Sequence, residues 1–181
     1  MSALRHWFIV IFVMSVLAAA QLAGAQVTAG HARNFDAGWL FTRGDPTGAD
    51  KAAFSDSNWR QLDLPHDWSI EGPIDQANTS GPRGGFFPAD VGWYRKHFTL
   101  SADDAGKDVF IQFDGVMANS DVYINGVNVG HRPYGWVTFQ YDLTAHVTFG
   151  PDKPNVISVR VDNSRQPASR YYEGAGIYRH V

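Results

Sequence analysis

The side chains of this chain that could do chemistry lie in three short stretches, each next to glycine, proline or the end of an apolar run. They are Asp67, Asp162, Asn163, Arg170 and Tyr171. Carboxylate and amide oxygens can accept hydrogen bonds from hydroxyl groups or coordinate a small cation. A guanidinium donates several hydrogen bonds, and a tyrosine ring offers an apolar face. These residue types are suited to binding a ligand rich in hydroxyl groups.

Each candidate also has a purely structural interpretation. Asp162-Asn163-Ser164 follows an alternating run that ends at Val161, where an Asx turn is the favoured alternative. Asp67 lies between His66 and Trp68 and could cap a turn beside core tryptophans. Arg170 could form a structural ion pair, with the adjacent tyrosines filling an interface. The seven histidines are scattered and cysteine is absent, so we predict no metal site.

The elements that must position these residues are short β-strands. Apolar residues alternate at Val109, Ile111 and Phe113, and again at Ile157, Val159 and Val161. Further runs with the same period lie at 93–100, 122–124, 127–129 and 137–141. Asn125-Gly126 separates two of them, which predicts a two-residue hairpin turn because both turn positions need positive φ. The pattern indicates an all-β sandwich or barrel.

The intervening segments read as loops. Residues 44–88 contain Asp-Pro, Gly-Pro and Gly-Gly pairs and are predicted to form long loops over the sandwich. Within them, Phe86-Phe87 reads as an exposed aromatic pair. Short helical turns could form at Ser55–Trp59 or Ser101–Asp104, where Ser could act as the cap.

Composition and the N-terminus narrow the class of protein. The chain has 181 residues and a net charge of -3, so it is too short for a (β/α)8 barrel and carries no basic excess for nucleic acid. Residues 1–25 contain a basic start, a continuous apolar run and Ala23-Gly24-Ala25, the layout of a secretory signal peptide. We therefore expect export to the periplasm or the extracellular space, cleavage near Gln26, and no membrane association of residues 26–181.

Several strings in a fixed order carry a resemblance to a known family. They are Asp36-Ala37-Gly38-Trp39, Leu64-Pro65-His66-Asp67-Trp68, Gly92-Trp93-Tyr94-Arg95-Lys96, Tyr123-Ile124-Asn125-Gly126 and Gly174-Ala175-Gly176-Ile177-Tyr178-Arg179. Together they resemble the N-terminal domain of glycoside hydrolase family 2, in particular its β-galactosidase branch. The resemblance covers residues 35–181 and implies a jelly-roll β-sandwich that resembles galactose-binding domains.

The resemblance also implies where function resides. In complete enzymes of this family an immunoglobulin-like domain and a (β/α)8 barrel follow, and two Glu residues of the barrel carry out retaining hydrolysis. The segment of Arg170 and Tyr171 would line the sugar pocket, although many β-galactosidases have Trp where this chain has Tyr171. Asp162 would lie near a position that touches galactose and sodium in some members, and Asp67 near the pocket mouth. A monovalent or divalent cation is therefore possible in the full-length enzyme.

The expectation is a non-catalytic domain of an exported, retaining β-galactosidase-like hydrolase that acts on O-glycosyl bonds. Nothing in the sequence brings Glu71 and Glu173 together as the two close carboxyl groups that retaining hydrolysis needs, so we expect no catalysis by this chain alone. Ile177, Arg179 and Val181 read as the start of another strand, which indicates a fragment. The expected partners are a β-galactoside-type carbohydrate and the enzyme's own downstream domains, with a homo-oligomer possible.

Two other functions remain open at the level of sequence. A free-standing carbohydrate-binding module would account for the aromatic content of 14%. A pure interaction domain would use Phe86 and Phe87 as its contact patch. We favour the hydrolase domain because most tryptophans lie in strand or turn motifs.

Overall fold

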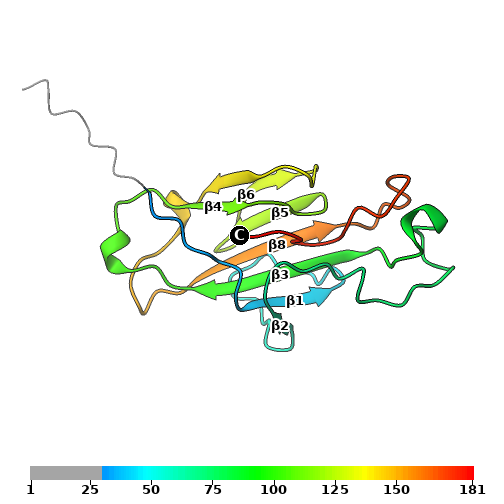
Figure 1. Cartoon of the computed structure of the whole chain (residues 1–181). Helices are drawn as coiled ribbons and strands as arrows, with labels where there is room; N and C mark the ends of the chain where they lie inside the picture. Colours follow the sequence, from blue (N-terminus) through cyan, green and yellow to red (C-terminus); the bar gives the residue numbers. More distant parts are fainter. Residues whose placement is uncertain (1–29) are drawn as a thin grey trace, which may run out of the picture. The chain divides into compact units, whose positions relative to one another are not determined.

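Eight strands and three short 3-10 turns make up the described part of the computed structural model, which covers residues 30–181 (Figure 1). The predicted signal peptide, residues 1–25, lies outside the described residues. Residues 34–181 form one unit with its own core. No helix among residues 30–181 has the length and apolar character needed to cross a membrane.

Six of the strands form one antiparallel sheet. Its order is β2 (Arg60–Leu62), β1 (Trp39–Arg43), β3 (Val91–Phe98), β8 (Asn155–Asp162), β5 (Ser120–Ile124) and β6 (Val127–Arg132). The central pair is β3 with β8, joined over eight residues from Val91 opposite Asp162 to Phe98 opposite Asn155. The long central strands are the scaffold to which the loops at both ends of the sheet are attached.

A second sheet of two antiparallel strands, β4 (Phe110–Phe113) and β7 (Phe139–Asp142), packs against the first. Ile111 and Phe113 of β4 share one apolar cluster with Val159 of β8 and Val122 of β5. The alternation predicted the buried face of β4, since Ile111 and Phe113 are buried while Phe110, the first residue of the strand, is 56% exposed. The prediction of an all-β sandwich is confirmed.

The hairpin predicted from Asn125-Gly126 joins β5 to β6. Asn125 has φ 51 and Gly126 has φ 85, and Ile124 pairs directly with Val127. The Asn125 side chain adds a second function, because its Nδ2 donates to the backbone oxygen of His146 at 2.8 Å. The turn therefore sets the register of the hairpin and also ties it to a distant loop.

The two predicted helical turns have different outcomes. The turn at Ser101–Asp104 is confirmed, because Ala102–Asp104 is a 3-10 helix capped by the Ser101 side chain. Ser55–Trp59 contains only a hydrogen-bonded turn. The expected strand at the end of the chain is also absent: among residues 177–181 no ladder forms, and the nearest bridge joins Gly176 to Met117.

The last segment is not a strand because its backbone groups bond to three different partners. The oxygen of Ile177 accepts from the backbone of His66, that of His180 from Asp114 and that of Val181 from Phe35. Ile177 is completely buried in the main core. The segment thus connects both sheets instead of extending either of them.

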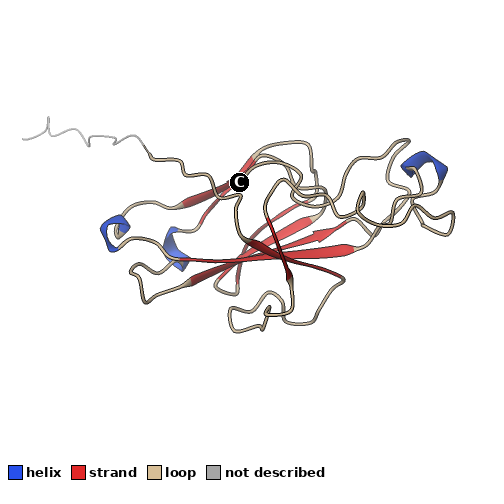
Figure 2. Ribbon diagram, turned by 60° about the horizontal axis from the view of Figure 1, so that its bottom comes forward, coloured by secondary structure: helices blue, strands red, loops and turns tan. Residues whose placement is uncertain are grey.

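The loops before β3 and after β8 lie at the same end of the six-stranded sheet, because Val91 and Asp162 are paired residues of antiparallel strands. Figure 1 shows them together as the long green loop and the red loop, and Figure 2 shows that both are largely without regular structure. Three of the predicted site residues, Asp67, Arg170 and Tyr171, are in these loops, and Asp162 and Asn163 lie where the second loop begins.

Candidate functional site

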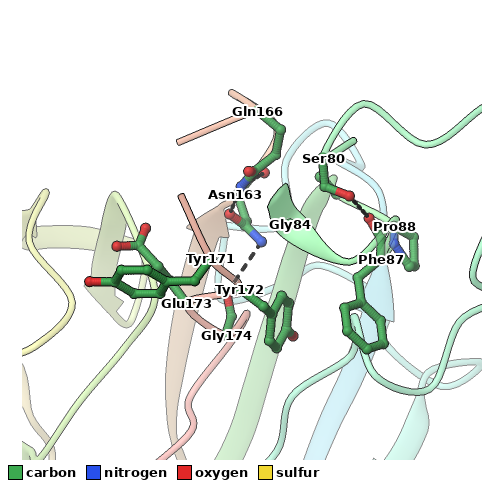
Figure 3. Close-up of a pocket in the computed structure, with 11 residues that line it drawn as sticks. Ser80, Gly84, Phe87, Pro88, Asn163, Gln166, Tyr171, Tyr172, Glu173 and Gly174 are labelled. Carbon is green, nitrogen blue, oxygen red and sulfur yellow. Dashed lines mark hydrogen bonds between the residues drawn. The ribbon is translucent and has the colours of Figure 1, made fainter. Parts of the chain in front are cut away.

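A shallow pocket lies between the loop before β3 and the loop after β8 (Figure 3). The first loop contributes Ser80, Gly84, Phe87, Pro88 and Ala89, and the second contributes Asn163, Gln166, Tyr171, Tyr172, Glu173 and Gly174. Its lining combines aromatic rings with hydroxyl, amide and carboxylate groups. Such a mixture suits a ligand that has both apolar faces and hydroxyl groups.

The loop before β3 is held in shape by polar side chains that bind its own backbone. Ser69 Oγ donates to the oxygen of Pro88 at 2.6 Å, and Ser80 Oγ donates to that of Phe87 at 2.7 Å. Asn78 Nδ2 donates to the oxygen of Phe86 at 2.8 Å. Because of this closure Phe86 and Phe87 are both half-buried, so the prediction of an exposed aromatic pair is wrong.

The loop after β8 is anchored at its start and its end. The backbone N–H of Asn163 donates to the backbone oxygen of Asp90 in the first loop at 2.9 Å. The side-chain Nδ2 of Asn163 donates to the backbone oxygen of Gly174 at 3.3 Å. Gln166 Nε2 donates to Asn163 Oδ1 at 2.6 Å. At the end of the loop Gly176 has φ +101 and a side chain there would collide with the Tyr94 hydroxyl, so only glycine fits. Asn163 therefore acts both as a lining residue and as the anchor of the loop.

Asp67 is the point at which the two loops meet. Its Oδ1 accepts a hydrogen bond from the backbone N–H of Ser69 at 3.0 Å, which is the predicted turn cap. The hydroxyl of Tyr172 donates to Oδ1 at 2.6 Å and to Oδ2 at 2.7 Å. Burial first, and then the hydrogen bond to Asp67 and its negative charge, raise the pKa of Tyr172 well above its usual range. The Tyr172 hydroxyl therefore keeps its proton and donates it to the Asp67 carboxylate.

Asp162 has the structural role that the sequence favoured. Its Oδ1 accepts from both the backbone N–H and the hydroxyl of Ser164, at 3.0 and 2.6 Å, and Oδ2 lies 3.4 Å from Arg160. Burial alone would raise the pKa of Asp162, but these hydrogen bonds and the Arg160 charge outweigh it and lower the pKa. Within residues 30–181 no cluster of three acidic or histidine side chains is placed to hold a metal ion. A role of Asp162 in binding sugar or sodium stays a prediction.

Arg170 and Tyr171 both project from the second loop. The Tyr171 side chain lines the pocket and is 64% exposed, and Arg170, which precedes it, is also exposed. No hydrogen bond or ion pair joins the Arg170 side chain to another residue of the described range 30–181. The structural alternative of an ion pair therefore has no partner here, and both side chains can turn toward a ligand.

Behind Asp67 lies a buried polar group that the sequence did not reveal. His66 Nδ1 lies 2.8 Å from the Tyr94 hydroxyl, and Arg60 Nη2 lies 2.8 Å from His66 Nε2. Arg60 can only donate, so Nε2 is the acceptor and Nδ1 carries the proton. Burial also lowers the pKa of His66, which agrees with a neutral ring even though Glu71 Oε2 lies 3.2 Å from Nε2. The neighbouring Asp67 is thus attached to a rigid support.

The two glutamates have separate roles. Glu71 binds Arg60 at 2.6 Å, and the Arg60 and His66 contacts lower its pKa although burial alone would raise it. Glu71 contacts Arg60 and His66, whereas Glu173 lines the pocket. The two carboxylates therefore do not form the close pair that retaining hydrolysis requires.

The fold and the pocket define a class of protein: a β-sandwich with a polar and aromatic site built from the loops at one end of its larger sheet. The family model described as glycosyl hydrolases family 2, sugar binding domain, matches residues 35–181. The chain belongs to glycoside hydrolase family 2, of which it contains the sugar-binding domain.

Relatives of known name and structure agree with this assignment. The chain is 55% identical over 148 residues to a β-galactosidase of Bacteroides ovatus, and 41% identical over 148 residues to a putative β-glucuronidase of Formosa agariphila. Each alignment covers 82% of this chain but only 17% and 14% of the relative. A solved β-glycosidase of Bacteroides vulgatus is 45% identical, with a TM-score of 0.80 over 83% of this chain and 20% of that one.

Proposed function

We propose that this chain is the non-catalytic, N-terminal part of an exported, retaining β-galactosidase-like hydrolase. Its role is to supply one wall of the sugar pocket, while the groups that cleave the glycosidic bond belong to a longer polypeptide. The observation that carries the proposal is the pocket itself. Tyr171 and Tyr172 line it at one end of a sandwich of this family, Arg170 precedes Tyr171 in the chain, and Tyr172 holds the carboxylate of Asp67.

A β-galactoside is the proposed substrate of the complete enzyme. The relative named as a β-galactosidase is 55% identical, against 41% for the one named as a putative β-glucuronidase. The chemistry of the pocket supports a neutral sugar, because the lining residue Glu173 would repel a carboxylate on the sugar. Arg170 would donate to hydroxyl groups, and the Tyr171 ring would pack on the apolar face of the sugar.

Export and a retaining mechanism are parts of the same proposal. Export is supported by the signal-peptide layout of residues 1–25. A retaining mechanism is proposed from membership of glycoside hydrolase family 2 and would use two carboxyl groups about 5–5.5 Å apart. Glu71 and Glu173 do not form such a pair, so the proposal assigns these groups to the longer polypeptide.

The test is to express the natural open reading frame from its first codon and to assay aryl β-galactoside, β-glucuronide and β-mannoside. We expect hydrolysis of the β-galactoside with retention at the anomeric carbon, followed by NMR. This chain alone, assayed as the matched control, should hydrolyse none of the three. The mass of the secreted protein should place its first residue near Gln26.

Preference for the β-glucuronide would overturn the substrate assignment. Hydrolysis by this chain alone would overturn the non-catalytic role, and an uncleaved cytoplasmic product would overturn export.

A further inference from the structure

The Asp67 carboxylate has acceptor capacity that the fold does not use. A carboxylate has about four lone-pair directions. Oδ1 accepts from the backbone N–H of Ser69, and the single proton of the Tyr172 hydroxyl is shared between Oδ1 and Oδ2. Among residues 30–181 no further donor to Oδ2 is recorded, and Asp67 is half-buried. One acceptor direction on Oδ2 is therefore left for a ligand.

Gly174 keeps that side of Asp67 accessible. It lines the pocket and has φ +100, a conformation that favours glycine. A Cβ at this position would lie 3.6 Å from Asp67 Oδ2, in van der Waals contact with it. Any side chain at residue 174 would therefore cover the oxygen that remains available.

Tyr172 connects Asp67 to the pocket wall. Its ring lines the pocket and lies beside that of Phe87 (Figure 3). The two ring centroids are 4.6 Å apart. Its hydroxyl contacts both carboxylate oxygens of Asp67, at 2.6 and 2.7 Å. The ring and the hydroxyl thus have separable functions, one in packing and one in holding the carboxylate.

We propose that Tyr172 is a positioning residue: its hydroxyl holds the Asp67 carboxylate so that Oδ2 accepts a hydrogen bond from one hydroxyl of the bound sugar. This inference rests on the proposed function of the pocket. Without the Tyr172 hydroxyl, Asp67 is restrained by Ser69 alone and can rotate away from the sugar. A hydrogen bond to a charged group is strong enough to change binding by about tenfold or more.

The experiment uses the complete enzyme and its Tyr172→Phe, Asp67→Asn and doubly substituted variants. The substrates are an aryl β-galactoside and its four analogues that each lack one of the 2-, 3-, 4- or 6-hydroxyl groups. We expect Tyr172→Phe to lower kcat/KM about tenfold on the parent sugar and on three analogues. On the fourth, which lacks the hydroxyl that Asp67 binds, the loss should be less than twofold.

Asp67→Asn should single out the same analogue, and the double variant should lose little more than the larger single loss. Tyr172→Phe keeps the ring that packs on Phe87, and thermal unfolding of every variant checks the fold. The matched control is Tyr134→Phe, which removes the hydroxyl of a 57% exposed tyrosine outside the pocket lining and should leave kcat/KM unchanged.

The two proposals fail in different ways. A uniform loss on all five sugars, or different analogues singled out by Tyr172→Phe and Asp67→Asn, would overturn the positioning role and leave the proposed function intact. If Tyr172→Phe does not fold, the deoxy series with Asp67→Asn decides alone. An equal loss on every analogue in that series would overturn the inference. A wild-type enzyme inactive on all β-galactosides would overturn both.

Discussion

At the scale of single residues, the structure divides the five predicted side chains by how fully they are engaged. The carboxylate oxygens of Asp162 contact Ser164 and Arg160. Arg170 and Tyr171, by contrast, are exposed. Asp67 lies between these extremes, because Tyr172 restrains it and one acceptor direction stays open. The sequence could name these residues but could not rank them, since an Asx turn and a ligand-binding acid have the same local pattern.

Removal of the exposed guanidinium should affect function and not stability. In the complete enzyme Arg170→Ala should lower kcat/KM for an aryl β-galactoside by about tenfold to a hundredfold, because a charged hydrogen-bond donor to the sugar is lost. The free energy of unfolding should change by less than about 0.5 kcal/mol, since the side chain has no recorded partner within residues 30–181. Steady-state kinetics and urea unfolding provide the two measurements.

The matched control for that substitution is Arg165→Ala, which removes an exposed arginine of the same loop outside the pocket lining. Equal losses of activity in the two variants would contradict a specific contact by Arg170.

The buried histidine should make the fold sensitive to mild acid. Burial lowers the pKa of His66 in the folded protein, whereas the unfolded chain has an ordinary value near 6.5. Below about pH 6.5 the unfolded state therefore binds more protons, and stability should fall as the pH falls from 7 to 5. The slope for one proton cannot exceed about 1.4 kcal/mol per pH unit.

Urea unfolding at pH 7, 6 and 5 measures this dependence, and His66→Gln should flatten it. A slope identical in wild type and His66→Gln would show that protonation of His66 does not destabilise the fold.

At the scale of elements, loops rather than strands carry the site, and single buried side chains hold the loops. The segment 44–59 between β1 and β2 has no strand or helix, yet it is fixed by Arg95 of β3, which is completely buried. Arg95 Nη1 donates to the oxygens of Ala49 and Lys51 at 2.6 and 3.0 Å, and its Nε donates to Asp56 at 2.8 Å. Hydrogen bonds from one guanidinium therefore hold this loop, where a strand would be held by backbone hydrogen bonds to its neighbour.

Loss of this guanidinium should release the loop. Arg95→Met should destabilise the fold by about 3–5 kcal/mol, because it leaves the loop carbonyls without their donor and the buried Asp56 with only His97 as a side-chain partner within residues 30–181. Limited proteolysis should then cut between residues 44 and 59 before the strands unfold.

Replacing both partners, as in Arg95→Met with Asp56→Leu, should recover part of the stability, since no uncompensated charge remains. Loss of stability without faster cleavage in segment 44–59 would contradict the role of Arg95 as the anchor of this loop.

The strands themselves were predictable because alternation is a local property of the sequence. The buried side chains of β4 and β8 and the turn at Asn125-Gly126 all lie where the pattern placed them. The structure of the final segment was not predictable in this way. Its alternating Ile177, Arg179 and Val181 resemble a strand, but its backbone bonds to three separate segments. Alternation reports which side chains are buried, and it does not report which backbone groups are available for pairing.

At the scale of the whole molecule, the proposed function makes this sandwich one side of a binding site. The pocket is shallow and is lined by two loops at the same end of the larger sheet. The chain spans 17% and 14% of the length of its two relatives described above. A ligand held only by this wall would bury little surface.

Calorimetric titration of this chain with galactose and with lactose should therefore give no measurable binding at millimolar sugar. The physical reason is that a few hydrogen bonds on an open surface do not exceed the cost of immobilising a sugar. Titration of the complete enzyme, under conditions where hydrolysis is followed separately, is the positive control. Binding by this chain alone in the range of ordinary lectins would favour the rival function, a free-standing carbohydrate-binding module.

The sequence by itself determined the fold class, the hairpin, the apolar core and the family, because each of these depends on residue types at short spacing or on motifs in a fixed order. Only the tertiary structure decided which side chains meet. Asp67 and Tyr172 are 105 residues apart and are joined because the loop before β3 and the loop after β8 leave the same end of the sheet. That proximity follows from strand order and register, which are set by packing of the whole chain and not by any local pattern.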